Sequence, residues 1–150
     1  TRQQWAAGCS RGDGGVAPTP ILHTVTDRPA IGTIEGDVEG DDARITVVLD
    51  LRGAQYYGQA LGDARPQHRA RLAGEAALRA VESRAGGTVA LDLLAVAAAD
   101  LGDQRVALAQ VGLPDGSILV GSTLIRDGDT QTAAVKAVMD ALNRRLPTLL

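Results

Sequence analysis

Aromatic residues are nearly missing from this sequence. Its 150 residues include no phenylalanine, one tryptophan and two tyrosines. Proteins stack flat aromatic side chains against bases, so a chain with so few offers little surface of that kind. Its hydrophobic residues are mostly alanine, valine and leucine. We therefore expect a core of small aliphatic side chains, in which helices pack close to sheets.

Cysteine and histidine are also scarce, which excludes several kinds of site. The one cysteine, Cys9, has no partner for an intrachain disulfide and cannot build a zinc cluster. The two histidines, His23 and His68, have no nucleophile or acid beside them in a catalytic arrangement. No glycine-rich phosphate-binding motif occurs. We therefore expect no enzymatic activity, no cofactor and no bound metal.

The chain also lacks a long apolar run and a strong net charge. No stretch approaches the roughly 20 apolar residues that a membrane-spanning helix needs. The formal net charge is -3, which disfavours general binding to nucleic acid or to anionic membranes. We expect a cytoplasmic protein with neither of these partners.

Residues 1–30 differ in composition from the rest of the chain. Glycine and proline are frequent there and no apolar period is evident, as in a tail or linker. We interpret residues 31–150 as one folded domain. Within the tail, Ile21–Val25 is a candidate edge strand and Trp5 a candidate anchor for a partner. Because the chain begins at Thr1 and not at methionine, we expect it to be a fragment or a processed product.

The clearest helical pattern lies near the end of the chain, over residues 130–146. Asp127 and Asp129 precede it and are typical helix-capping residues, whose negative charge also suits the start of a helix. Its apolar residues recur at helical spacing, which places them on one face. They are Val135, Val138, Met139, Leu142 and Leu146.

The two halves of the chain show the same order of elements. A second helix is predicted over residues 67–84, and three strands precede each helix. The apolar stripe of this earlier helix consists of Leu72, Ala73, Ala76, Ala80 and Val81. The predicted strands are residues 31–39, 44–51, 55–61, 90–100, 105–113 and 117–125, with an Asp-Gly hairpin turn before the last.

Local matches support an internal repeat. RITV at 44–47 matches RVAL at 105–108, YGQA at 57–60 matches VGST at 120–123, and the helices match between 72–82 and 133–143. The predicted fold is α+β, with tandem βββα units, antiparallel sheets, helices packed on one side and a pseudo-twofold axis. Because such small units expose sheet edges and apolar surface, we expect them to pair within the chain and to form a homodimer.

Two charged clusters allow two interpretations. Either they are solvated faces with local ion pairs, or they form a complementary docking surface that weakens with salt. The acidic cluster lacks the spacing of a calcium loop. It consists of Glu35, Asp37, Glu39, Asp41 and Asp42, and the basic cluster of Arg65, Arg69, Arg71, Arg79 and Arg84.

The end of the chain resembles a known family. Asp129-Thr130 followed by residues 134–144 (AVKAVMDALNR), together with the two βββα units, resembles the carboxy-terminal regulatory domain of 2-isopropylmalate synthase over about residues 31–146. The resemblance implies a domain that dimerises, binds leucine near the junction of the units and regulates a metal-dependent barrel. That barrel is absent from these residues. The sequence also departs from the family at the entry to the first helix, where Gly62–Pro66 replaces a Gly-Asn-Gly-Pro-type sequence.

Two functions follow as hypotheses. The first is a non-enzymatic regulatory and dimerisation domain, with a small apolar or amino-acid effector at the repeat or dimer interface. The second is a protein-interaction or scaffold domain without a small ligand, whose amino-terminal tail docks on a partner or sister subunit. A closed pocket at the helix starts would favour the first, and a continuous exposed apolar patch the second. The candidate effector residues, where free helix amides could meet a carboxylate, are Gly62, Asp63, Asp127, Gly128, Asp129 and Thr130.

Overall fold

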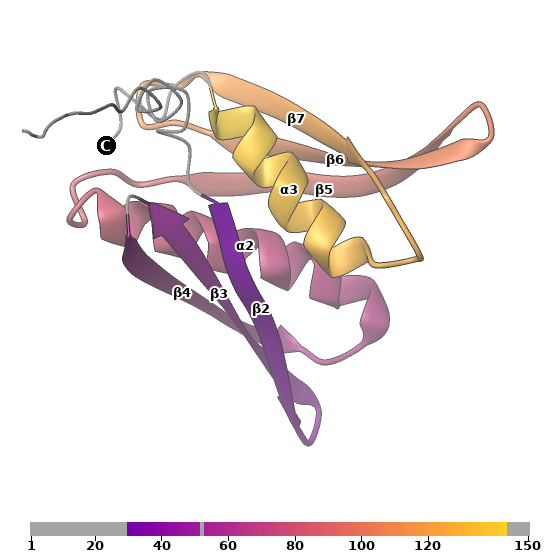
Figure 1. The fold of residues 1–150 in the computed structure, drawn as a ribbon, viewed down its shortest axis with the longest axis horizontal. Helices are drawn as coiled ribbons and strands as arrows, with labels where there is room; N and C mark the ends of the chain where they lie inside the picture. The colour runs from indigo at the N-terminus through magenta and orange to yellow at the C-terminus, as the bar shows by residue number, and fades with distance from the viewer. Residues whose placement is uncertain (1–29, 52, 144–150) are drawn as a thin grey trace, which may run out of the picture.

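The computed structural model describes residues 30–51 and 53–143, which form two βββα units in tandem (Figure 1). The first unit comprises β2 (Ala30–Glu39), β3 (Asp42–Leu51), β4 (Ala54–Asp63) and α2 (Pro66–Arg84). The second comprises β5 (Asp92–Leu101), β6 (Gln104–Gly112), β7 (Ile118–Leu124) and α3 (Thr130–Leu142). Each unit has its own antiparallel three-stranded sheet, in the orders β2-β3-β4 and β5-β6-β7. The predicted α+β fold of repeated βββα units is thereby confirmed.

Several interpretations fall outside the described residues. They concern the tail up to residue 29 and the chain after Asn143. The residues involved are Trp5, Cys9, His23 and Ile21–Val25 at one end, and Leu146 at the other.

The two sheets repeat each other in detail. In each, the first strand carries a register shift at the same place, between Ile31 and Thr33 in β2 and between Leu93 and Ala95 in β5. The hairpins that follow both turn on a glycine of positive φ, 65° at Gly40 and 64° at Gly102. Such a conformation is costly for other residues, so the repeated glycines reflect a repeated turn geometry.

A glycine on the last strand of each sheet lets the helix lie directly on the strand backbone. A Cβ atom added at Gly58 would lie 2.0 Å from the Ala76 carbonyl oxygen, and one added at Gly121 would lie 2.1 Å from that of Ala137. No side chain fits in such a space. The sequence match of YGQA with VGST therefore reflects one packing contact made twice.

The predicted match between the middle strands is wrong by one residue. Gly58 pairs with Val47 on β3, and Gly121 pairs with Ala109 on β6. Val47 therefore corresponds to Ala109 and not to Leu108. Val47 and Ala109 are buried whereas Leu108 is exposed, because a slip of one residue in a strand moves a side chain to the opposite face.

Both helices contribute to one shared core. The predicted stripes of α2 and α3 are buried as far as the structure describes them, and α2 contacts α3 and β5 as well as β3 and β4. At Gly74 of α2, an added Cβ would lie 3.0 Å from Leu93 of β5 and 3.3 Å from Val138 of α3. The helices thus join the two units, and each sheet turns its other face outward.

Hydrogen bonds also tie α2 to the start of the second unit. Arg71 donates to the carbonyl oxygen of Leu93 at 2.7 Å, and Glu82 accepts from the backbone amide of Leu91 at 2.7 Å. Arg79 pairs with Glu82 on the same helix. These contacts agree with local pairing of the α2 arginines.

Candidate functional site

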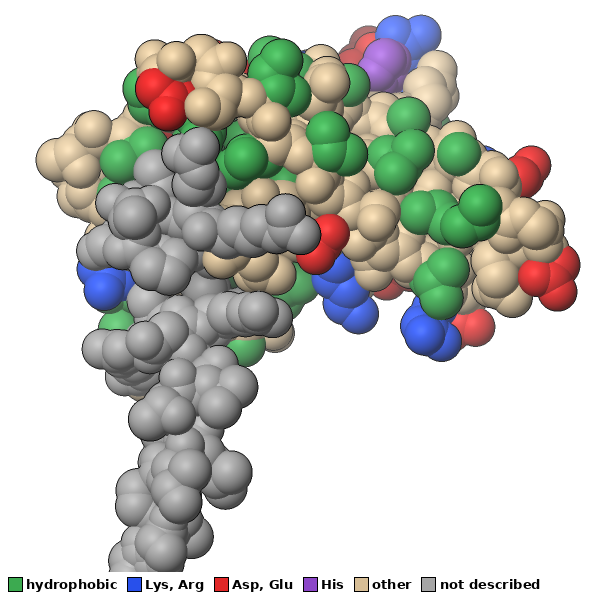
Figure 2. Space-filling view, turned by 90° about the horizontal axis from the view of Figure 1, so that it is seen from above, with side chains coloured by type: hydrophobic (Ala, Val, Ile, Leu, Met, Phe, Trp, Pro, Cys, Tyr) green, Lys and Arg blue, Asp and Glu red, His purple; other side chains and the backbone are tan. Residues whose placement is uncertain are grey.

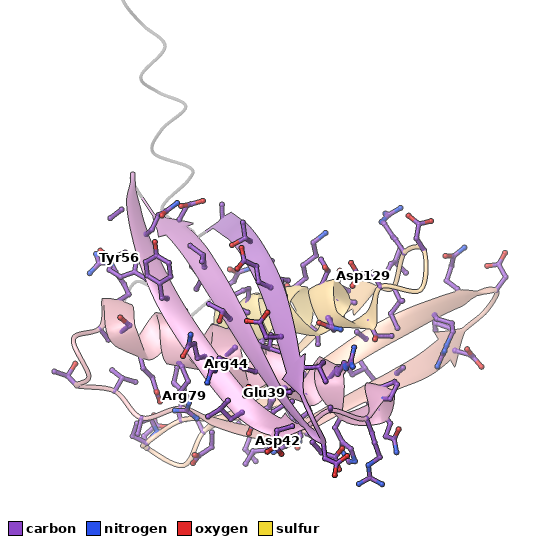
Figure 3. All side chains as sticks on the ribbon, turned by 90° about the horizontal axis from the view of Figure 1, so that it is seen from below. Glu39, Asp42, Arg44, Tyr56, Arg79 and Asp129 are labelled. Atoms are coloured by element: carbon purple, nitrogen blue, oxygen red, sulfur yellow. The ribbon has the colours of Figure 1, made fainter. Side chains whose placement is uncertain are left out.

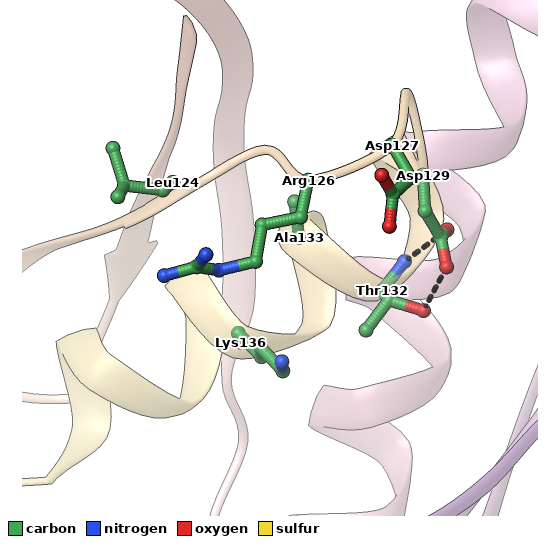
Figure 4. A pocket seen from close by; sticks show the side chains of 7 residues that line it. All are labelled: Leu124, Arg126, Asp127, Asp129, Thr132, Ala133 and Lys136. Carbon is green, nitrogen blue, oxygen red and sulfur yellow. Dashed lines mark hydrogen bonds between the residues drawn. The ribbon is translucent and has the colours of Figure 1, made fainter. Parts of the chain in front are cut away.

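The predicted site residues at the start of α3 form a tight turn. β7 ends at Leu124, and Asp127 and Gly128 follow with φ of 54° and 71°. Asp129 then caps the helix: its carboxylate accepts from the backbone amide of Thr132 at 3.0 Å and from the hydroxyl of Thr132 at 2.7 Å (Figure 4). These bonds favour the charged carboxylate, so the pKa of Asp129 lies below its ordinary value.

A cleft of about 210 Å³ lies beside this turn (Figure 4). It includes two of the four predicted residues, Asp127 and Asp129, whereas Gly128 and Thr130 do not line it. Its remaining residues are not predicted from the sequence, although Ala133 lies one helical turn after Asp129 and could have been found by that spacing. The missed residues are Leu124, Arg126, Thr132, Ala133 and Lys136.

This cleft combines both charges with a small apolar wall. Asp127 and Asp129 supply negative charge, Arg126 and Lys136 supply positive charge, and Ala133 is apolar. A small zwitterion matches that arrangement. The amide of Thr132 is already bonded to Asp129, so a ligand carboxylate would meet Arg126 or Lys136. Five of the seven lining residues are exposed, and the cleft is open to solvent.

The equivalent turn at the start of α2 is built differently. Asp63 accepts from the backbone amide of Arg65 at 2.9 Å and pairs with its guanidinium at 2.6 Å. These contacts lower the pKa of Asp63 to about 2. Gly62 faces α2, where an added Cβ would lie 2.8 Å from Leu72. A shallow hollow here is lined by Asp63 but not by Gly62, and shares no residue with the cleft at α3.

A third hollow lies where the two units meet. Ile31 of β2 borders it from the first unit, and Met139, Asp140 and Lys136 border it from α3. Asp140 also accepts a hydrogen bond from the backbone amide of Ser122 at 2.9 Å, which occupies an amide of the edge strand β7. Of the hollows described, this one lies at the repeat interface, the place expected for an effector.

The outer face of the β5–β7 sheet exposes several large apolar side chains. Side chains alternate along β6, so that Ala107, Ala109 and Val111 point to the helices and the residues between them point outward. The strand register places the outward residues of all three strands in rows. Asp92 and Leu101 also point outward, at the two ends of β5. We call the residues between these ends the apolar face: Leu94, Ala95, Ala97, Ala99, Val106, Leu108, Gln110, Ile118, Val120, Ser122 and Leu124.

The apolar face is continuous, and the one charged side chain that the register places on the same outer face is Asp92, at the end of β5 in the row of Ile118. Gln110 and Ser122 are its polar members, and Val120, the most exposed of its large residues, is 65% exposed. The Leu94 side chain covers Gly112, so the apolar surface has no gap at the bulge of β5. Figure 2 views the molecule from above and shows hydrophobic side chains spread over much of the visible surface, with charged ones mainly at its borders.

The outer face of the β2–β4 sheet carries several charged side chains beside the exposed Tyr57 and Leu61. The register places Glu35, Asp37, Arg44 and Asp50 on it, and Gln59 donates across the strands to Thr46 at 3.2 Å. Figure 3 shows Arg44 on this sheet, and Glu39 and Asp42 where β2 turns into β3. The two units therefore share an inner design but differ in their outer faces.

The remaining candidates form no site in the described part of the chain. His68 lies in the first turn of α2. Among the described residues, no group of three or more His, Cys, Asp or Glu side chains could hold a metal ion. No helix that the structure describes is long and apolar enough to cross a membrane. Neither a scan against protein-family models nor a search of curated proteins finds a match to this chain.

Proposed function

We propose that this chain is a non-enzymatic assembly domain that forms a homodimer in the cytoplasm. The observation that carries the proposal is the apolar face of the β5–β7 sheet, which the chain itself leaves uncovered in its described part. The largest apolar patch on a typical monomer covers about 300–600 Å² and is often an interaction site. Resemblance to a regulatory domain that dimerises supports the same function.

Sedimentation velocity of the purified chain tests this function. We expect the mean sedimentation coefficient to rise with protein concentration, from a monomer value at about 1 µM toward a dimer value at several hundred µM. A single monomer boundary over the whole range would contradict the proposed function.

A second candidate function is effector binding at the cleft beside α3. The same cleft is lined by two cations, Arg126 and Lys136, and two carboxylates, Asp127 and Asp129, so both charges of an amino acid would find an opposite charge there. The cleft is open, so this candidate ranks below assembly. Leucine is the first ligand to test, since the resemblance to 2-isopropylmalate synthase implies it.

Thermal unfolding with added branched-chain amino acids tests the effector. A ligand that binds the native state raises the unfolding midpoint increasingly as its free concentration exceeds its Kd, whereas dimerisation raises the midpoint with protein concentration alone. Replacing Arg126 by glutamine should abolish the ligand-dependent rise. The matched control is Arg44→Gln on the outer face of β3, which should leave it unchanged. A midpoint that no branched-chain amino acid raises would contradict effector binding for this group of ligands.

A further inference from the structure

The β5–β7 sheet has the composition of a sheet that is covered on both sides, but its outer face, the apolar face, is exposed to solvent. β6 carries buried Ala109 toward the helices and exposed Leu108 toward solvent, so both faces of this strand present aliphatic side chains. Sheets with one solvated face normally alternate apolar with polar residues, and near-continuous apolar strands occur where both faces are covered. The composition of β5–β7 therefore indicates a second layer.

We propose that this layer is the β5–β7 sheet of a second copy of the chain, stacked face to face with β6 over β6. The proposal rests on the assembly function and adds to it the surface and the packing. Sheets of this kind stack about 10 Å apart with strand directions within about 30° of each other. Leu108, in the central strand and in the row of Ala97 and Ser122, would lie near the twofold axis.

The charge distribution favours an identical copy as the occupant. In a twofold contact each surface meets itself, so a charged side chain near the axis meets its own like charge. The register places one charged side chain on this outer face, Asp92, in the row of Ile118 at the end of β5 and away from Leu108. The residues near the axis therefore meet their own copies without repulsion. The corresponding face on β2–β4 carries Glu35, Asp37 and Asp50 against one cation, Arg44, and would repel its own copy.

In the described part of the chain one outer face is apolar, so assembly through it stops at two copies. Contacts between two different faces can continue into open filaments, whereas a self-complementary contact uses up the surface that makes it. Because the outer face of β2–β4 is charged, it offers no second place for a sheet to stack. The chain would therefore form dimers and not larger stacks.

The size of the face bounds the strength of the contact. Three strands about 4.8 Å apart and seven residues at about 3.3 Å each cover roughly 300 Å² in projection. A standard interface buries about 800 Å² on each partner, so this contact lies at the small end. We expect a dissociation constant in the micromolar range, of order 1–100 µM.

The test compares one substitution at two equivalent positions. Val120 and Tyr57 each precede the close-packed glycine of their unit, point to the outer face, and are 65% and 59% exposed. Sedimentation velocity would be measured for the wild type, Val120→Lys and Tyr57→Lys, with circular dichroism at low concentration to check folding. We expect Tyr57→Lys to dimerise like the wild type and Val120→Lys to raise the dissociation constant at least tenfold.

The other outcomes are separable. A dimer that survives Val120→Lys unchanged would overturn the stacking of β5–β7 while leaving dimerisation itself intact. A wild type that stays monomeric would overturn the assembly function together with the stacking. Should Val120→Lys fail to fold, the uncharged Val120→Gln replaces it, with Tyr57→Gln as its control, and the same comparison decides.

Discussion

At the scale of single residues, the close-packed glycines are the positions least open to change. Their Cβ atoms would meet backbone atoms of the helices, which cannot move aside as a flexible side chain can. We expect Gly58→Ala and Gly121→Ala each to lower the free energy of unfolding by about 3 kcal/mol or more. Chemical denaturation at a low protein concentration measures this change.

Gly36→Ala is the matched control for the glycine substitutions. An added Cβ there would lie 3.9 Å from Ile45, an ordinary contact, and alanine is generally preferred to glycine within a strand. We expect Gly36→Ala to be neutral or to stabilise the protein by up to about 1 kcal/mol. Equal losses at Gly36 and Gly121 would contradict the close approach of helix to strand.

Ionisation of Asp129 stabilises the folded protein, because the charged carboxylate caps α3. Hydrogen bonds from Thr132 hold its pKa in the folded protein below the ordinary value. Its stabilising contribution is therefore fully present above the unfolded-state pKa and is lost as the pH falls through the folded one. We expect Asp129→Ala to cost about 1 kcal/mol near pH 7, as for other helix caps.

The pH dependence separates this capping interaction from a general loss of structure. The difference in unfolding free energy between wild type and Asp129→Ala should shrink as the pH falls below the ordinary aspartate value near 3.9. Asp127→Asn is the control, because asparagine tolerates the positive φ of 54° found there. A difference that stays constant down to pH 2 would argue against the charged cap.

At the scale of elements, the sequence predicts most of the fold because its signals are local. The stripe of α3, the capping role of Asp129 and the glycine turns each depend on residues a few positions apart. The register of the middle strands was missed because matching Arg44 to Arg105 ignored which face each neighbour occupies. In a strand, a one-residue error reverses every side chain.

The outer face of β5–β7 was not predicted, for a different reason. A run such as LLAVAAA in β5 has the composition of a strand covered on both sides, and composition alone does not say what covers it. The cleft beside α3 was predicted in part, since Asp127 and Asp129 adjoin the helix start in sequence. Its cations were missed because Arg126 and Lys136 converge only when β7 and α3 are folded together.

Glu82 gives a test of how firmly the two units are joined. Its carboxylate accepts from the backbone amide of Leu91 and pairs with Arg79. We expect Glu82→Ala to cost about 1.5–3 kcal/mol, the range for hydrogen bonds to charged groups. Glu75→Ala, on the same helix and without these bonds, should cost less than about 0.5 kcal/mol. Equal costs in thermal or chemical unfolding would show that the Glu82 contact does not hold the units together.

At the scale of the whole molecule, the repeat is conserved inside and varied outside. The paired glycines and the matching bulges recur in both units, and the residues that face the shared helical core are apolar in both. The outer faces have no such constraint within the chain, and there one unit is charged and the other apolar. Because the difference is confined to the outer faces, we infer that the two faces contact different surroundings. Contacts made through the charged face and through the apolar face should therefore respond differently to salt.

Salt dependence distinguishes assembly through the apolar face from assembly through charged clusters. Ionic contacts between the acidic residues of β2 and the arginines of α2 would weaken as screening increases, because the Debye length falls below about 5 Å at half-molar salt. Apolar contacts are insensitive to sodium chloride and are strengthened by sulfate. We expect the dissociation constant of the dimer to change less than about threefold between 0.05 and 0.5 M sodium chloride and to fall in ammonium sulfate. A dimer that dissociates as sodium chloride rises would instead assign the interface to the charged clusters, and the apolar face would then have no part in holding the two copies together.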